Sequence, residues 1–180
     1  MNYLKENILE IKCFLVVLII FLTPFFSVGQ PRYEKRELND VDQFIQVADS
    51  LAMRSQTNFV LTKFLKGERA YKERWNYLIN RGKIVLFEVN YIIDSSEYAE
   101  IYYVDKNNLV CSEEYETANS SYLEDELKWG GIYYFVSAVP RRIVTLGKKK
   151  TIEGTPEESL VYNRFRKRYA ELKMHLPMLP

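Results

Sequence analysis

Between residues 75 and 146, apolar and polar side chains alternate along the chain with a period of two. The longest such stretch, residues 83–93, reads KIVLFEVNYII, where Val85, Phe87 and Val89 alternate with their neighbours. Successive side chains of a strand point to opposite faces of its sheet, so this rhythm predicts strands that each bury one face. We predict strands over residues 75–79, 83–93, 98–104, 109–117, 129–136 and 142–146.

Short polar turns separate these stretches. Residues 80–83 (NRGK) and 105–108 (DKNN) combine turn-forming side chains, and a last hairpin turn is expected around residues 138–140. Connections this short join antiparallel neighbours, so the pattern predicts a meander sheet of five or six strands. Residues 57–66 fit a strand or a helix, and their β-branched side chains favour a strand.

Two other segments change to helical spacing. Asn39 has the chemistry of a helix N-cap, and the apolar stripe after it consists of Val41, Phe44, Ala48 and Leu51. This predicts a helix over residues 40–54. Residues 155–158 (TPEE) form a capping box with proline at the first helical position. We expect Pro177 to end this second helix, whose apolar stripe consists of Val161, Phe165, Tyr169, Leu172 and Leu176.

One sheet with two amphipathic helices makes an α+β fold. We expect the N-terminal and the C-terminal helix to pack on one face of the sheet, in a single domain of residues 39–176. A flexible lead-in of residues 30–38 would precede this domain. Such a layer arrangement leaves the opposite face of the sheet open, and tyrosines on an open face offer contact area together with a polar tip.

The first 29 residues have the order of a secretory signal peptide. Lys12 precedes an apolar run over residues 14–26 (FLVVLIIFLTPFF), and Ser27-Val28-Gly29 offers small residues for cleavage. The alternative is an uncleaved membrane anchor, because acidic residues dilute the positive charge before the run. We expect cleavage after residue 29 and an exported protein, either periplasmic or secreted.

Composition and cysteine content narrow the class of protein. The 180 residues are 47% hydrophobic and 27% charged, which is typical of a globular protein, with 25 basic and 24 acidic side chains. A chain this close to neutral is a poor candidate for nonspecific nucleic-acid binding. Past the signal only Cys111 remains, so no intramolecular disulfide can form, and its apolar surroundings predict a small buried side chain.

Three segments of the sheet region are alike. Each combines an aromatic strand, a polar turn and an aliphatic pair that opens the return strand. The segments are Asn76-Tyr77 with Ile84-Val85, Tyr102-Tyr103 with Leu109-Val110, and Tyr133-Tyr134 with Ile143-Val144. The similarity could reflect an internal repeat. It would also arise if consecutive hairpins simply pack in the same way.

Over residues 75–147 this pattern resembles small exported proteins of Bacteroidetes-type bacteria with tyrosine-rich β-hairpins. It is also distantly similar to the hairpin repeats of bacterial antitoxin-type and MORN-like modules, although it lacks the regular glycines of MORN repeats. The resemblance implies a binding or assembly module and carries over no catalytic residue.

Candidate catalytic groups are few. His175 is the only histidine in the chain, and one histidine with one cysteine cannot supply the three or four ligands of a zinc site. We predict no cofactor and no metal. Glu114 and Glu116 share a strand face, with Glu88 and Glu100 expected on neighbouring strands, and paired carboxylates can hydrolyse glycosidic bonds. The alternative function is therefore a carboxylate-dependent hydrolase acting on envelope glycans.

The tyrosines and the basic C-terminal helix favour binding over catalysis. We predict an exported, non-enzymatic binding or assembly module whose partner is a protein or an envelope glycan, and not nucleic acid. Membrane contact would occur through an uncleaved signal segment or the basic C-terminal helix. The candidate binding residues are Tyr98, Tyr102, Tyr103, Tyr133, Tyr134, Arg164 and Arg168.

Overall fold

The computed structural model of the protein describes residues 30–65, 69–118, 127–147 and 157–178. The chain divides into two compact units, residues 1–40 and 41–180, and the packing described below concerns the second unit. The elements are α2 (Gln30–Ser55), β1 (Thr57–Phe64), β2 (Ala70–Asn80), β3 (Lys83–Ile93), β4 (Ser96–Asp105), β5 (Asn108–Ala118), β6 (Leu127–Val136), β7 (Val139–Gly147), α3 (Glu157–His175) and a 3-10 turn, η1 (Leu176–Met178).

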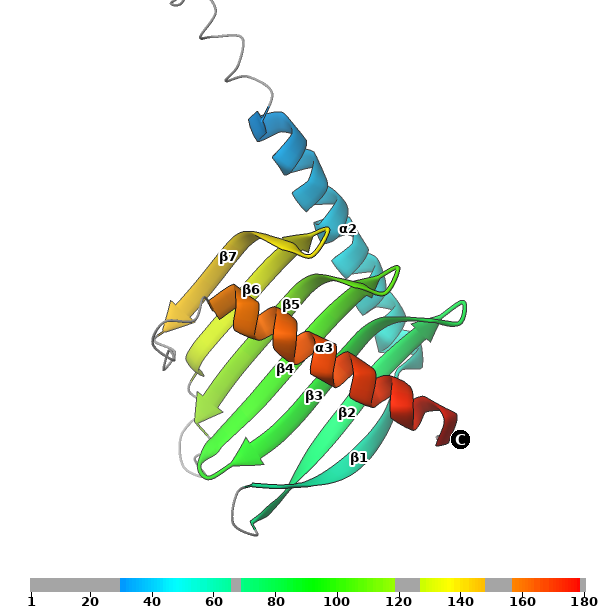
Figure 1. The fold of residues 1–180 in the computed structure, drawn as a ribbon, viewed down its shortest axis with the longest axis vertical. Coiled ribbons are helices and arrows are strands. Elements are labelled where there is room, and N and C mark those ends of the chain that lie inside the picture. Colours follow the sequence, from blue (N-terminus) through cyan, green and yellow to red (C-terminus); the bar gives the residue numbers. More distant parts are fainter. Residues whose placement is uncertain (1–29, 66–68, 119–126, 148–156, 179–180) are drawn as a thin grey trace, which may run out of the picture. The chain divides into compact units, whose positions relative to one another are not determined.

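The described strands form one antiparallel sheet in the order β1-β2-β3-β4-β5-β6-β7, so neighbours in sequence are neighbours in space (Figure 1). The α+β meander is confirmed, with seven strands in place of the expected five or six. The additional strand is β1, which the ambiguous residues 57–66 provide. β1 and β7 are the two edges of the sheet.

The two helices pack on opposite faces of the sheet, and the expectation of a shared face was wrong. α3 lies across the face that carries Trp75 and Phe87, while residues 41–55 of α2 pack against the face that carries Leu78 and Tyr103. The strands present apolar side chains on both faces, as sheets covered on both sides do. Period-two alternation identifies the two faces but does not say which helix covers which.

Two hydrophobic clusters result, one on each side of the sheet. The larger cluster lies under α3 and contains Trp75, Phe87, Tyr102, Tyr133, Phe135, Val161, Phe165 and Leu172 among its buried members. The smaller cluster lies under α2 and contains Val41, Ala48, Leu78, Leu86, Tyr103 and Cys111. Cys111 is fully buried, as predicted, and burial raises the pKa of its thiol.

Three hairpins of the sheet, β2–β3, β4–β5 and β6–β7, are built alike. Each closes with two residues of positive φ, namely Arg81-Gly82, Lys106-Asn107 and Ser137-Ala138. Positive φ at both positions marks the type I′ turn, whose twist matches that of the flanking strands. Each return strand then carries one bulged residue, which is Val85, Val110 or Arg141. The near-repeat in the sequence therefore corresponds to one hairpin geometry used three times.

The third hairpin differs from the prediction. The turn is Ser137-Ala138, and Pro140 lies inside β7 opposite Phe135. Proline is tolerated there because β7 is an edge strand, where a missing backbone N–H need not cost a ladder hydrogen bond. The residues equivalent to Ile84-Val85 are consequently Pro140-Arg141, not the expected Ile143-Val144.

Ala138 holds a backbone conformation that suits glycine better. Its φ is 65°, and it occupies the place that Gly82 takes in the first hairpin with φ 74°. Because a Cβ is disfavoured at positive φ, we expect Ala138→Gly to raise the free energy of unfolding by about 0.5–1 kcal/mol. Urea denaturation measures the change, and the mirror variant Gly82→Ala is expected to lower stability by a similar amount. A loss of stability on Ala138→Gly would contradict this account.

The N-terminal helix begins ten residues earlier than the sequence pattern predicted. α2 begins at Gln30, within the expected lead-in, because the segment PRYEKREL consists of good helix formers behind a proline that the first turn accepts. α3 begins at Glu157, and the 3-10 turn η1 contains Pro177. The predicted signal of residues 1–29 and residues 155–156 of the predicted capping box lie outside the described residues.

Candidate functional site

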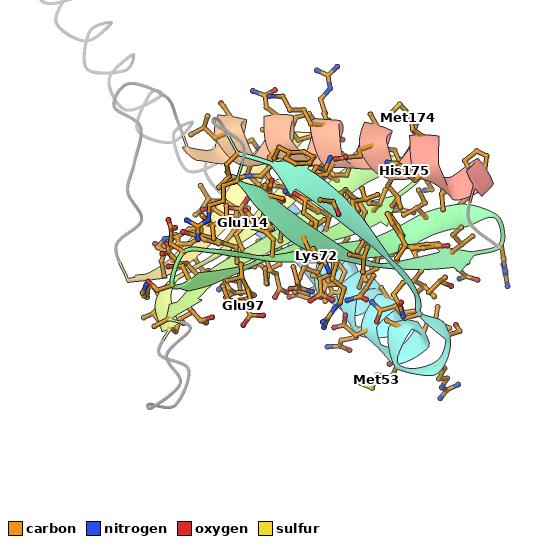
Figure 2. All side chains as sticks on the ribbon, turned by 90° about the horizontal axis from the view of Figure 1, so that it is seen from below. Met53, Lys72, Glu97, Glu114, Met174 and His175 are labelled. Carbon is orange, nitrogen blue, oxygen red and sulfur yellow. The ribbon has the colours of Figure 1, made fainter. Side chains whose placement is uncertain are left out.

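A layer of buried charges separates α3 from the sheet. Glu73 of β2, Glu100 of β4 and Glu114 of β5 point to the α3 side, and each is at most 3% exposed. Arg164 and Arg168 face them from α3, one helical turn apart. Figure 2 shows Glu114 on this side of the sheet. Two of the residues predicted to bind a partner are thus the cations of an internal network.

Arg168 bridges two carboxylates. Its Nη1 lies 2.7 Å from Glu73 Oε1, and its Nε lies 2.9 Å from Glu100 Oε2. The guanidinium also lies over the ring of Trp75, with Cζ 5.5 Å from the ring centroid. Burial alone would lower the pKa of Arg168, but Glu100 and Glu73 raise it above its ordinary value.

Tyrosine hydroxyls complete the coordination of the same carboxylates. Glu100 accepts hydrogen bonds from Tyr91 at 2.9 Å and from Tyr102 at 3.0 Å. Glu73 accepts from Tyr71 at 3.2 Å and from the indole N–H of Trp75 at 3.1 Å. Burial, followed by the nearby negative charge of Glu100, raises the pKa of Tyr91 and of Tyr102. The carboxylates therefore hold their phenols protonated as hydrogen-bond donors.

Arg164 forms a second ion pair, with Glu114. Its Nε lies 3.1 Å from Glu114 Oε1, and its side chain remains 32% exposed against 4% for the carboxylate. Glu116, two residues further along β5, accepts hydrogen bonds from Ser96 and Tyr98 and lies near Lys128. Glu114 and Glu116 share a strand face, as expected, and each is paired with its own cation.

The predicted tyrosines divide into a buried and a partly exposed set. Tyr102 and Tyr133 are fully buried under α3, and Tyr103 is 4% exposed under α2, where its hydroxyl donates to Asp49 at 3.0 Å. Tyr98 and Tyr134 are partly exposed. The open tyrosine face expected from the sequence is absent from the described sheet, because α3 and α2 cover the centres of both faces.

Glu73 is the charged member of this network that the sequence analysis did not single out. The predicted strand began at Trp75, two residues after Glu73, so the alternation was not extended back to it. β2 begins at Ala70, which places Glu73 on the same face as Trp75. The sequence did contain a signal for this site. Tyr71 and Trp75 lie two residues before and after Glu73, and both can donate a hydrogen bond to its carboxylate.

The buried ion pairs between α3 and the sheet hold the helix against the strands. Glu73, Glu100 and Glu114 each face an arginine of α3, so the arrangement stabilises buried charges between the helix and the sheet. In the described residues no group of three or more histidine, cysteine, aspartate or glutamate side chains could hold a metal ion. Searches against protein-family models, curated proteins and solved structures found no match to this chain.

The most distinctive exposed feature lies elsewhere, on the edge strand β7. Twelve large hydrophobic side chains of the described residues are exposed, and four of them belong to this one strand. They are Val139, Ile143, Val144 and Leu146, with exposed fractions of 43–66%. Exposed apolar side chains on an unpaired strand favour pairing with a further strand. The sequence suggested β7 only as the return strand of a hairpin, with no sign that it ends the sheet.

A second exposed region lies on the α2 side of the sheet. Lys72, Arg74 and Asn90 line a shallow cavity of about 280 Å³ together with apolar side chains and Glu97. Figure 2 labels Lys72 and Glu97 there. On α3, Arg166, Lys167 and Lys173 are exposed, so the predicted basic surface of this helix is present.

Proposed function

We propose that this protein is an exported, non-enzymatic binding or assembly module that acts on a protein or a cell-envelope component through the β7 edge of its sheet. The observation that carries the proposal is the concentration of exposed apolar side chains on β7. Exposed apolar side chains along an unpaired edge strand favour the addition of a further strand from a partner. Because the sheet centres are covered by helices, the edge replaces the open tyrosine face as the expected contact surface.

The two halves of β7 differ in a way that supports pairing. The first half carries Pro140 and the bulged Arg141, and proline, charge and bulges are the devices that protect sheet edges. The second half, residues 143–147 (IVTLG), has none of these devices. An added strand would therefore bind along this second half.

β1, the other edge, exposes two large apolar side chains, Val60 and Phe64, in place of the four on β7. Lys63 of β1 forms an ion pair with Glu171 of α3, which ties this edge to the helix. His175 packs against Phe59 of β1, with ring centroids 5.9 Å apart. The end of α3 thus supports β1, and it leaves β7 as the edge available to a partner.

The hydrolase alternative receives less support from the geometry. Glycoside hydrolysis needs two carboxyl groups that face one substrate, one of them as the acid. Glu100 is closed off by Arg168 and two phenols, and Glu114 is buried against Arg164. A glycanase assay with the Glu114→Gln variant separates the two proposals, since the binding module predicts that wild type and variant are equally inactive.

Export is part of the proposal and rests on residues 1–29. No helix in the described part of the chain is long and apolar enough to span a bilayer. N-terminal sequencing of the chain recovered outside the cytoplasm is expected to start at Gln30. A chain that retains residues 14–26 would instead support the membrane-anchor alternative.

Affinity capture from a solubilised envelope extract tests the binding proposal. The exported protein is expected to retain a stoichiometric partner, and the Leu146→Lys variant is expected to lose it, because a charged side chain would enter the paired edge. Val60→Lys on β1 is the matched control, since Val60 is also exposed, at 57%, and lies on the opposite edge. Equal recovery by all three proteins would contradict a role for β7.

A further inference from the structure

We infer that the strand that pairs with β7 is the β7 of a second copy of this chain, in antiparallel orientation with Thr145 on the twofold axis. The inference rests on the proposed function, because it names the partner of the same edge. It would join two described sheets into one continuous sheet across a symmetric, self-complementary contact.

The free backbone groups of β7 follow from the hairpin geometry. Val136 and Val139 close the type I′ turn, so they form a hydrogen-bonded pair. Bonded and non-bonded pairs alternate along an antiparallel ladder, and counting along β6 makes Ile132↔Val144 a bonded pair. The backbone N–H and C=O of Val144 therefore point toward β6. Those of its neighbour Thr145 point outward, away from the sheet, as do those of Ile143. Gly147 has a φ of 78°, so the regular strand ends at this residue.

These outward groups match those of a second β7 when Thr145 lies opposite its own copy. Thr145 then pairs with Thr145 as a hydrogen-bonded pair, and Ile143 lies opposite Gly147 at each end of the shared ladder. Between them, Val144 pairs with Leu146 in the non-bonded positions, where cross-strand side chains lie closest. The register places apolar side chains opposite apolar ones and leaves room beside Ile143, because glycine has no side chain.

Charge and proline disfavour longer or shifted registers. Centring the pair nearer Arg141 would bring Pro140, which cannot donate a hydrogen bond, and the arginines into the shared ladder. With Thr145 on the axis, the two copies of Arg142 lie six residues apart along the ladder, about 20 Å. Lys148-Lys149-Lys150 follow the ladder directly in the sequence, so the two basic edges repel each other, and salt weakens this repulsion by screening it.

An unrelated extended segment is the competing occupant. The described β7 has two arginines and no acidic residue, so an acidic strand from another protein would gain electrostatic attraction that a second copy lacks. Self-pairing predicts the opposite salt response: the complex should tighten as salt rises, because each edge carries the same charge. Salt dependence therefore distinguishes the two occupants.

Sedimentation of the purified exported protein tests the inference. A five-residue ladder is small compared with a standard protein interface of about 1,600 Å², so a weak, concentration-dependent dimer is expected. Leu146→Lys is expected to weaken the dimer at least tenfold, while Val60→Lys leaves it unchanged. A wild type that stays monomeric at high concentration and high salt, or a dimer broken equally by Val60→Lys, overturns the inference.

Single cysteines test the register. Thr145→Cys is expected to form an intermolecular disulfide on mild oxidation, because bonded pairs have Cα atoms about 5.5 Å apart, within the disulfide range. Val139→Cys is the matched control on the same strand. Its two copies would lie twelve residues apart along the ladder, about 41 Å, and should not crosslink. Crosslinking at Val139, or at neither position, overturns the register.

The dimerisation and capture experiments together distinguish the proposed binding function from the inferred self-pairing of β7. A monomeric protein that still captures an envelope partner through β7 refutes self-pairing and leaves the binding function standing. If the chain forms the dimer and captures nothing, self-pairing holds and the function is assembly of this chain with itself. If there is neither a dimer nor a Leu146-dependent partner, both proposals fail.

Discussion

Replacing Arg168 with methionine is expected to lower the free energy of unfolding by about 3–5 kcal/mol at neutral pH. Arg168 is the only cation within hydrogen-bond reach of either Glu73 or Glu100 among the described contacts, and its side chain is 15% exposed. Without it, two carboxylates would lie buried between α3 and the sheet with only neutral donors. The Coulomb repulsion between them adds to the cost of burial.

Urea denaturation followed by circular dichroism measures this loss. Arg166→Met is the matched control, because Arg166 lies on the same helix with its side chain exposed, and a change within about 0.5 kcal/mol is expected. A triple variant with Arg168→Met, Glu73→Gln and Glu100→Gln should recover much of the stability, since no unpaired charge then remains buried. A single variant as stable as wild type would show that the network does not hold α3.

Stability is expected to fall steeply as the pH rises above about 10, the ordinary pKa of tyrosine. Burial raises the pKa of Tyr102 and Tyr103 in the folded protein, and Glu100, Glu113 and Asp49 add negative charge around them. Above pH 10 the unfolded chain loses these protons while the folded chain keeps them. The folded state then binds more protons, so stability decreases with pH, by about 1.4 kcal/mol per pH unit for each tyrosine.

The slope of unfolding free energy against pH, between pH 10 and 11.5, is the measurement. Tyr102→Phe should flatten it by about 1.4 kcal/mol per pH unit, whatever the variant's stability at neutral pH. Cys111 adds to the slope from lower pH, because burial raises its thiol pKa above 9.0. An unchanged slope in Tyr102→Phe would contradict a phenol held protonated by burial and Glu100.

Local pattern was enough to define the strands and their order. The strand predicted over residues 83–93 is confirmed as β3 (Lys83–Ile93), and the turns at 80–83 and 105–108 lie where the sequence indicated. Gly82 and Asn107 indicate these turns in the sequence, because both residue types adopt positive φ at low energetic cost. The turn at Ser137-Ala138 contains neither glycine nor asparagine. The turn was therefore predicted around Pro140, because proline is common in turns.

The candidate site was recognised only in fragments. Arg164, Arg168 and Glu114 were singled out from the sequence, but as an exposed patch and a possible catalytic acid. Their pairing depends on where α3 crosses the sheet, and Arg168 meets Glu73 across a sequence separation of 95 residues. No local pattern encodes a contact of that kind, because side-chain spacing fixes a face of an element but not its neighbour.

The sequence alone determined the α+β class, the consecutive antiparallel strands and the burial of Cys111, since these follow from period, turn chemistry and short connections. Only the tertiary structure decided that α2 and α3 cover opposite faces, that Tyr71, Tyr91 and Tyr102 donate to buried carboxylates, and that β7 ends the sheet with its apolar side chains exposed. Both faces of the strands are apolar, so either could receive either helix. The choice is made by packing and charge pairing between segments distant in the chain.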